Sequence, residues 1–119
     1  MRQLIGDQGE VTIVRIDALP NDIILANVEK NDVGHHIISH SESGHHHVLT
    51  SRGEDIAVME RRSAPAGMKI FYAILKNPQS FEQTAPVPHE KYDLRPGVYE
   101  FRIAREYDPF LQQARRAMD

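Results

Sequence analysis

Short apolar runs separated by turn residues recur along the whole chain. Runs of about four to eight residues that are rich in β-branched or aromatic side chains, and are bounded by Gly, Pro, Asn, Asp or Ser, are typical of β-strands. The pattern predicts strands at 11–16, 23–28, 33–39, 45–50, 56–60, 68–75 and 98–107. A meander of antiparallel strands is therefore expected.

The cleanest period-two alternation lies after the turn at Pro96-Gly97. Successive side chains of a strand point to opposite faces of a sheet. The core face should carry Tyr99, Phe101 and Ile103, and the opposite face should carry Glu100, Arg102 and Ala104. This segment is the clearest strand prediction in the chain, while the continuous apolar run at 68–75 predicts a central strand.

Two segments depart from the strand pattern. Four of the seven prolines fall between Pro78 and Pro96, and proline cannot donate to a strand ladder, so we expect irregular structure there. Asp108-Pro109 has the sequence of a helix N-cap and first helical residue, which predicts a short terminal helix over 108–118.

The length and composition indicate one ordinary globular domain over residues 1–119. Its predicted fold is all-β, a small antiparallel barrel or a jelly-roll-like sandwich of about seven to eight strands with the short C-terminal helix. The chain contains no cysteine, no long apolar segment and no secretion signal. We therefore expect a cytoplasmic protein that does not enter a membrane.

Charge and motif content exclude several classes of function. A net charge of −3 leaves no excess of basic residues to neutralise phosphates, so nucleic acid is not an expected partner. The seven glycines are dispersed and form no phosphate-binding loop, so no nucleotide cofactor is expected. Ser39, Ser41 and Ser43 lie near His40, but no strained nucleophile turn surrounds them.

Six of the seven histidines fall between His35 and His47, on both sides of a Ser-Glu-Ser-Gly loop. A four-residue hairpin loop would pair His40 with His45, Ile38 with His47 and His36 with Leu49. Neutral imidazole is a good ligand for zinc, iron or nickel and a weaker one for manganese. The pattern predicts a divalent-metal site with an open position at His40, His45 and His47, with His89 or the loop residue Glu42 as a further ligand or base.

The His45-x-His47 pair after Gly44, in a β-rich chain, resembles the first metal motif of the cupins. Ser51 and Arg52 stand where that family has a glutamate, and Pro96 to Glu100 matches its second motif only in part. The resemblance implies a jelly roll with His45 and His47 as metal ligands and Glu100 or His89 as the third. The histidine-rich segment also resembles small uncharacterised bacterial or phage-borne proteins.

Two functions from different classes follow. In the first, a small cupin-like barrel binds a divalent transition metal through the histidine hairpin and acts on a small organic molecule. In the second, the histidines form a solvated surface on a non-enzymatic binding or accessory module that forms homo-oligomers through edge strands and the terminal helix. Metal-free acid–base chemistry at the histidines is a further alternative.

Overall fold

The computed structural model describes residues 2–25, 28–40, 45–50, 57–65, 67–84 and 90–104. These residues contain ten strands and no helix, and so none that could span a membrane. The strands are β1 (Gln3–Gln8), β2 (Val11–Ile16), β3 (Ile23–Leu25), β4 (His36–Ser39), β5 (His47–Leu49), β6 (Ala57–Arg61), β7 (Met68–Leu75), β8 (Gln79–Gln83), β9 (Tyr92–Leu94) and β10 (Gly97–Ala104).

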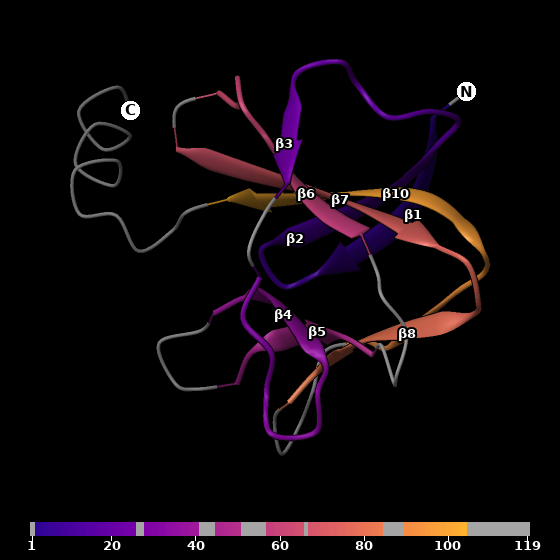
Figure 1. Cartoon of the computed structure of the whole chain (residues 1–119). Coiled ribbons are helices and arrows are strands. Elements are labelled where there is room, and N and C mark those ends of the chain that lie inside the picture. Colours follow the sequence, from indigo (N-terminus) through magenta and orange to yellow (C-terminus); the bar gives the residue numbers. More distant parts are fainter. Residues whose placement is uncertain are drawn as a thin grey trace.

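The strands form two antiparallel sheets that lie one above the other (Figure 1). The larger sheet has the order β1-β2-β10-β7-β6-β3, and the smaller has the order β4-β5-β8-β9. The chain passes from the larger to the smaller sheet between β3 and β4 and again between β7 and β8, and it returns between β5 and β6 and between β9 and β10. The predicted all-β class and the arrangement in two sheets are therefore confirmed, with ten described strands in place of the predicted seven to eight. The closed-barrel alternative is wrong, because neither sheet closes on itself among the described strands.

The predicted strands vary in accuracy. The bounds of β2 and β7 match the sequence prediction, whereas β4 and β5 are shorter than predicted. The strand predicted at 23–28 is described as β3 up to Leu25, and residues 26–27 lie outside the described residues. The expectation of irregular structure between Pro78 and Pro96 is wrong for two segments, which form β8 and β9. Strand β1 was not predicted, and the terminal helix predicted over 108–118 lies outside the described residues.

The main core lies between the two sheets. Phe101 of β10 and Phe81 of β8 are fully buried, and their ring centroids are 5.1 Å apart. The larger sheet contributes the alternate residues of β2, β7 and β10, including all three predicted core residues of β10, and the smaller sheet contributes Ile38, Leu49, Phe81 and Leu94. Alternation in the central strands thus gives each sheet one apolar face that is removed from water.

A second apolar cluster covers the outer face of the larger sheet and includes Tyr72, Met59 and Ile70. Glu100 lies on this face, as predicted, but it is only 1% exposed. The Tyr72 hydroxyl donates to Glu100 Oε1 at 2.7 Å, Arg102 Nε donates to Oε2 at 2.9 Å, and Arg2 also donates to Oε2. Burial alone would raise the pKa of Glu100, but these donors outweigh it and hold the pKa below its ordinary value.

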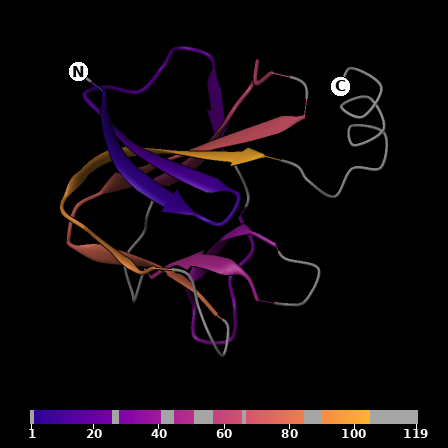
Figure 2. The same cartoon turned by 180° about the vertical axis from the view of Figure 1, so that it is seen from behind.

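The turn between β1 and β2 positions two polar side chains at the edge of the core. Gly9 has φ of 58° and Glu10 does not have a positive φ, which fits a type II′ hairpin turn with glycine at the first central position. The tip of this hairpin lies beside the β4 and β5 strands of the smaller sheet (Figure 2). The side chains of Gln8 and Glu10 are thereby directed towards the histidine hairpin.

Gly6 allows a close contact between β1 of the larger sheet and Tyr92 of the smaller sheet. A Cβ at Gly6 would overlap the Tyr92 ring, whose hydroxyl donates to the Asp7 carbonyl at 2.9 Å. We expect Gly6→Ala to lower the free energy of unfolding by about 1–3 kcal/mol, because the ring must move and its hydrogen bond is lost. Urea denaturation would measure the change. In a Tyr92→Ala background the same substitution should cost far less, and an equal cost there would contradict this explanation.

Candidate functional site

His47 lies at the start of β5 and is the most deeply buried histidine among the described residues, at 1% exposed. Its Nδ1 is 2.8 Å from Gln8 Oε1 and its Nε2 is 3.1 Å from Glu10 Oε2. The imidazole lies nearly parallel to the Phe81 ring, with the ring centroids 6.1 Å apart. His47 is thus fixed on two edges by polar partners and on one face by the core.

The register of the histidine hairpin differs from the prediction at one position. His36 pairs with Leu49 as expected, but His47 pairs with Ser39 and not with Ile38, because the register shifts between Ile37 and Ser39. An extra residue of this kind turns the following side chain to the other face. As a result Ser39 Oγ donates to Glu10 Oε1 at 2.6 Å, so that both carboxylate oxygens have a partner.

The Gln8 amide determines which nitrogen of His47 carries hydrogen. Gln8 Nε2 donates to the backbone carbonyls of Phe81 at 3.0 Å and Glu90 at 2.8 Å. Since both amide hydrogens are used, Gln8 Oε1 must be the atom that faces His47. A carbonyl oxygen can only accept, so His47 Nδ1 is the protonated nitrogen.

Two acceptors therefore face each other at the other edge of the ring. A neutral imidazole protonated at Nδ1 presents a lone pair at Nε2, and that lone pair is directed at a carboxylate oxygen of Glu10, whose side chain is 11% exposed. Such a contact is unfavourable unless a positive charge lies between the atoms. A second proton, which makes the ring an imidazolium paired with the Glu10 carboxylate, or a metal ion between the two atoms would satisfy both of them.

The other predicted ligands occupy different places. His40 is exposed, and its Nε2 is 3.2 Å from Glu29 Oε2. The His40 ring contacts His46 edge to face, with the ring centroids 4.7 Å apart. His45 is half-buried beside them, and His89 lies outside the described residues, as do Glu42, Ser41 and Ser43. Within the described ranges no three His, Asp or Glu side chains have the arrangement of a metal site.

Burial keeps the neighbouring histidines neutral. Desolvation lowers the pKa of His46, and the charges of His40 and His45 lower it further, against an opposing effect of Glu29. Desolvation also lowers the pKa of His36, with a contribution from Lys30. Because the ordinary histidine pKa is near 6.5, a lowered pKa leaves both rings mostly uncharged at neutral pH.

Glu100 does not serve as the third ligand that the cupin resemblance implies. It pairs with Tyr72 on the outer face of the larger sheet, whereas His47 packs against Phe81 in the inter-sheet core. Its carboxylate is also engaged by two arginines. The alternation that separates Glu100 from Phe101 places it on the wrong side of the sheet for that role.

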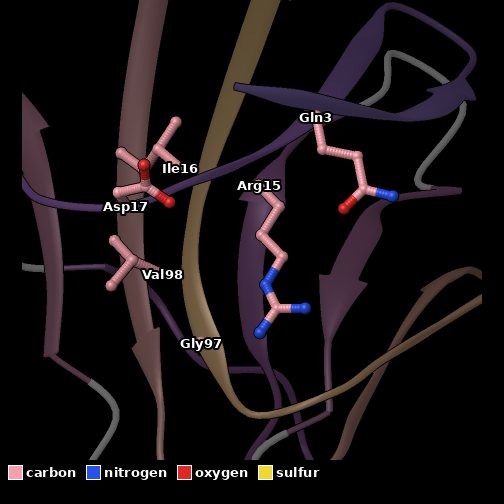
Figure 3. A pocket seen from close by; sticks show the side chains of 6 residues that line it. All are labelled: Gln3, Arg15, Ile16, Asp17, Gly97 and Val98. Carbon is pink, nitrogen blue, oxygen red and sulfur yellow. The ribbon is translucent and has the colours of Figure 1, made fainter. Parts of the chain in front are cut away.

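A cavity of about 290 Å³ lies at the far end of β2 and β10 (Figure 3). Arg15 runs along β10 towards Gly97, and its Nη2 donates to the Pro96 carbonyl at 3.0 Å. A Cβ at Gly97 would come within 2.9 Å of Arg15 Nε, so glycine leaves the room that the guanidinium occupies. This cavity is lined by neither His47 nor Glu10.

The sequence interpretation missed Gln8, Glu10 and Ser39. The available signal was Gln-Gly-Glu directly before the apolar run at Val11, which reads as a hairpin turn with polar residues on both sides of its glycine. The side chains that meet are far apart along the chain, with Glu10 and His47 separated by 37 residues. No local sequence pattern indicates that these two side chains are in contact.

Comparison with known proteins gives one finding. A family model described as Domain of unknown function (DUF8820) matches residues 7–104. No curated protein matches the chain, and no solved structure does. The match spans the residues from β1 to the end of β10, and therefore includes every side chain of the His47 network.

Proposed function

The chain belongs to the DUF8820 family, and we propose that it is a metal-binding protein in which His47 Nε2 and Glu10 Oε2 hold a divalent transition metal. The observation that carries this proposal is that His47 Nε2, which has a lone pair when the ring is neutral, lies 3.1 Å from Glu10 Oε2. Two ligands bound at about 2.0–2.1 Å in a tetrahedral sphere are about 3.3 Å apart. The two atoms are therefore already close to the spacing that a zinc-like ion requires.

The partners of the two ligands support the same proposal. A histidine that binds metal almost always donates its other N–H to an oxygen, which fixes the ring and its tautomer. Gln8 Oε1 provides that acceptor at 2.8 Å, and Ser39 Oγ orients the Glu10 carboxylate at 2.6 Å. These two contacts reduce the entropy cost of ordering the ligands when the ion binds.

We assign one further ligand position to His89. His45 is not assigned, because the described residues, which include Glu10, His45 and His47, contain no group of three His, Asp or Glu side chains that could hold a metal ion. His89 directly precedes Glu90, whose carbonyl accepts the 2.8 Å hydrogen bond from Gln8. His40 is not assigned, because it contacts Glu29 and His46.

Such an ion would be zinc, iron, nickel or manganese, according to the mixed nitrogen and oxygen donor set. A coordination position left to water or substrate would let it act as a Lewis acid on a small organic molecule. The chain's own residues hold and orient the ion: Gln8 sets the His47 tautomer, and Ser39 sets the Glu10 carboxylate.

A homo-oligomeric module is the second candidate function. Leu4 of β1 is 65% exposed and Leu25 of β3 is 80% exposed, and these two strands are the opposite edges of the larger sheet. Exposed apolar edges can pair with another copy of the chain. This function would become the working proposal if the metal experiment fails.

The metal proposal is tested with Glu10→Gln. A glutamine amide can accept from Ser39 and donate to His47 Nε2, so this variant should fold without any shared cation. Untagged wild-type protein, purified without a metal-affinity column, should contain about one metal ion per chain by elemental analysis. Glu10→Gln should bind that metal more than about 100-fold less tightly.

His46→Gln is the matched control, because it changes a neighbouring histidine of the same segment whose ring contacts His40. It should retain the metal, while His89→Ala should weaken metal binding. Wild-type protein that takes up no zinc, iron, nickel or manganese would overturn the proposal. Undiminished metal in the folded Glu10→Gln variant would do the same.

A further inference from the structure

A cleft of about 230 Å³ opens between the sheets, lined by residues of β4, β6 and β7. Ile38 and Phe71 of the main core contribute apolar lining, and four titratable side chains also line the cleft: Glu29, His40, Glu60 and Lys69. None of these residues belongs to the proposed metal site. An apolar cavity with a few convergent polar groups is the usual form of a small-molecule site.

Two of the charged side chains project from the inner face of the larger sheet. Glu60 is directly opposite Phe71 in the β6–β7 pair, and Lys69 is directly opposite Ile103 in the β7–β10 pair. Residues opposite each other in an antiparallel pair share a face, and Phe71 and Ile103 belong to the inter-sheet core. Glu60 and Lys69 are therefore directed towards the smaller sheet, where a purely structural face would carry apolar side chains.

The charges on the two walls are satisfied differently. On the β4 side, Glu29 is already paired with His40 at 3.2 Å. On the β6–β7 side, the Lys69 ammonium lies 5.0 Å from the centre of the Phe71 ring. In the part of the chain that the structure describes, Glu60 has no ion pair and Lys69 has no carboxylate within 4.0 Å. Glu60 and Lys69 thus both face the cleft, and they do not form an ion pair with each other.

We propose that this cleft binds a small α-amino acid with an aliphatic side chain. Glu60 and Lys69 are diagonal neighbours across β6 and β7, with Cβ atoms about 7 Å apart, a spacing that an ammonium and a carboxylate on one carbon atom can bridge. The ligand's ammonium binds Glu60, its carboxylate binds Lys69, and its side chain packs on Ile38 and Phe71. The volume of about 230 Å³ lies just below the range of about 300–1,000 Å³ that is usual for ligand pockets, which suits a ligand as small as leucine.

Three related ligands test the proposal by calorimetry and by NMR shift titration. L-leucine should bind saturably, whereas 3-methylbutan-1-amine lacks the carboxylate and 4-methylpentanoate lacks the ammonium. Each should bind at least about tenfold more weakly, because a charge-assisted hydrogen bond is lost and one charged group of the cleft is left without a partner. Equal binding of either truncated ligand would overturn the assignment.

Glu60→Gln and Lys69→Met should each reduce leucine affinity by about tenfold or more. Lys91→Met is the matched control, since Lys91 is exposed beside Asp93 on the smaller sheet and does not line the cleft. Unchanged affinity in both cleft variants, or no leucine binding at millimolar concentration, would refute the proposal. Leucine binding should persist in Glu10→Gln, so the failure of the metal site and the failure of the cleft are separate results.

Discussion

Glu100→Ala should lower the free energy of unfolding by about 3 kcal/mol, the lower end of what breaking a buried ion pair costs. The hydroxyl of Tyr72, which is fully buried, would lose its acceptor, and a buried donor without a partner costs about 1–3 kcal/mol. Arg2 and Arg102 keep the loss from being larger. Their side chains are part exposed and can turn to water.

The same variant should change the response to acid. Because the folded-state pKa of Glu100 lies below its ordinary value of 4.5, the unfolded chain binds the proton more readily. The stabilisation from Glu100 is fully present above pH 4.5 and is lost as the pH falls through the lower folded-state value. Urea denaturation at several pH values from 7 to 3 should show a shallower acid loss in Glu100→Ala than in wild type.

Tyr72→Phe provides the companion measurement. Burial and the Glu100 carboxylate raise the pKa of Tyr72 to about 12, so its hydroxyl is a donor throughout this range. The two substitutions share one hydrogen bond, so the double variant should be less destabilised than the sum of the singles. Strict additivity, or an acid dependence identical to that of wild type, would show that Glu100 does not stabilise the sheet in this way.

The central strands of the larger sheet could be predicted because their local patterns agree with the final fold. Tyr99, Phe101 and Ile103 alternate with Glu100 and Arg102, and the first three are all in the core. Burial of Glu100 could not be predicted from the same pattern. Its partner Arg2 is 98 residues away in the chain, and only the pairing of β1 and β2 beside β10 brings it there.

The proline-rich region differs from the sequence prediction because its prolines flank the strands and do not interrupt them. Pro78 directly precedes β8 and Pro96 directly precedes β10, so neither residue has to donate within a ladder. Proline is excluded from the interior of a strand but is tolerated at its first residue and next to its ends. The short strands β8 and β9 lie between those positions.

Histidine could be predicted as the residue type of the candidate site, but the side chains that contact His47 could not. The register was correct at His36 and Leu49, and it failed where the bulge moves Ser39 opposite His47. The shift directs Ser39 towards Glu10 and leaves His40 beside Glu29 and His46. This one-residue shift of register therefore separates His40 from His47, which an ideal hairpin would have placed on one face.

The buried His47 is linked to the centre of the core by a stack of three rings. The imidazole lies over Phe81 with ring planes 11° apart, and Phe81 lies over Phe101 at 5.1 Å. The backbone carbonyl of Phe81 also accepts one of the two hydrogens of Gln8 Nε2. Phe81 therefore supports both the ring of His47 and the amide that fixes its tautomer.

Phe101→Ala should lower the free energy of unfolding by about 3–5 kcal/mol, because it removes a fully buried ring and leaves a cavity between the sheets. It should also weaken metal binding at the proposed site by about 10–100-fold, since Phe81 loses the support that orients His47 and Gln8. Urea denaturation and metal competition, at a temperature where the variant is folded, measure the two effects. Leu4→Ala on the exposed edge is the control, and it should change the free energies of unfolding and of metal binding by no more than about 0.5 kcal/mol each. A folded Phe101→Ala protein with wild-type metal affinity would show that the ring stack serves the core alone.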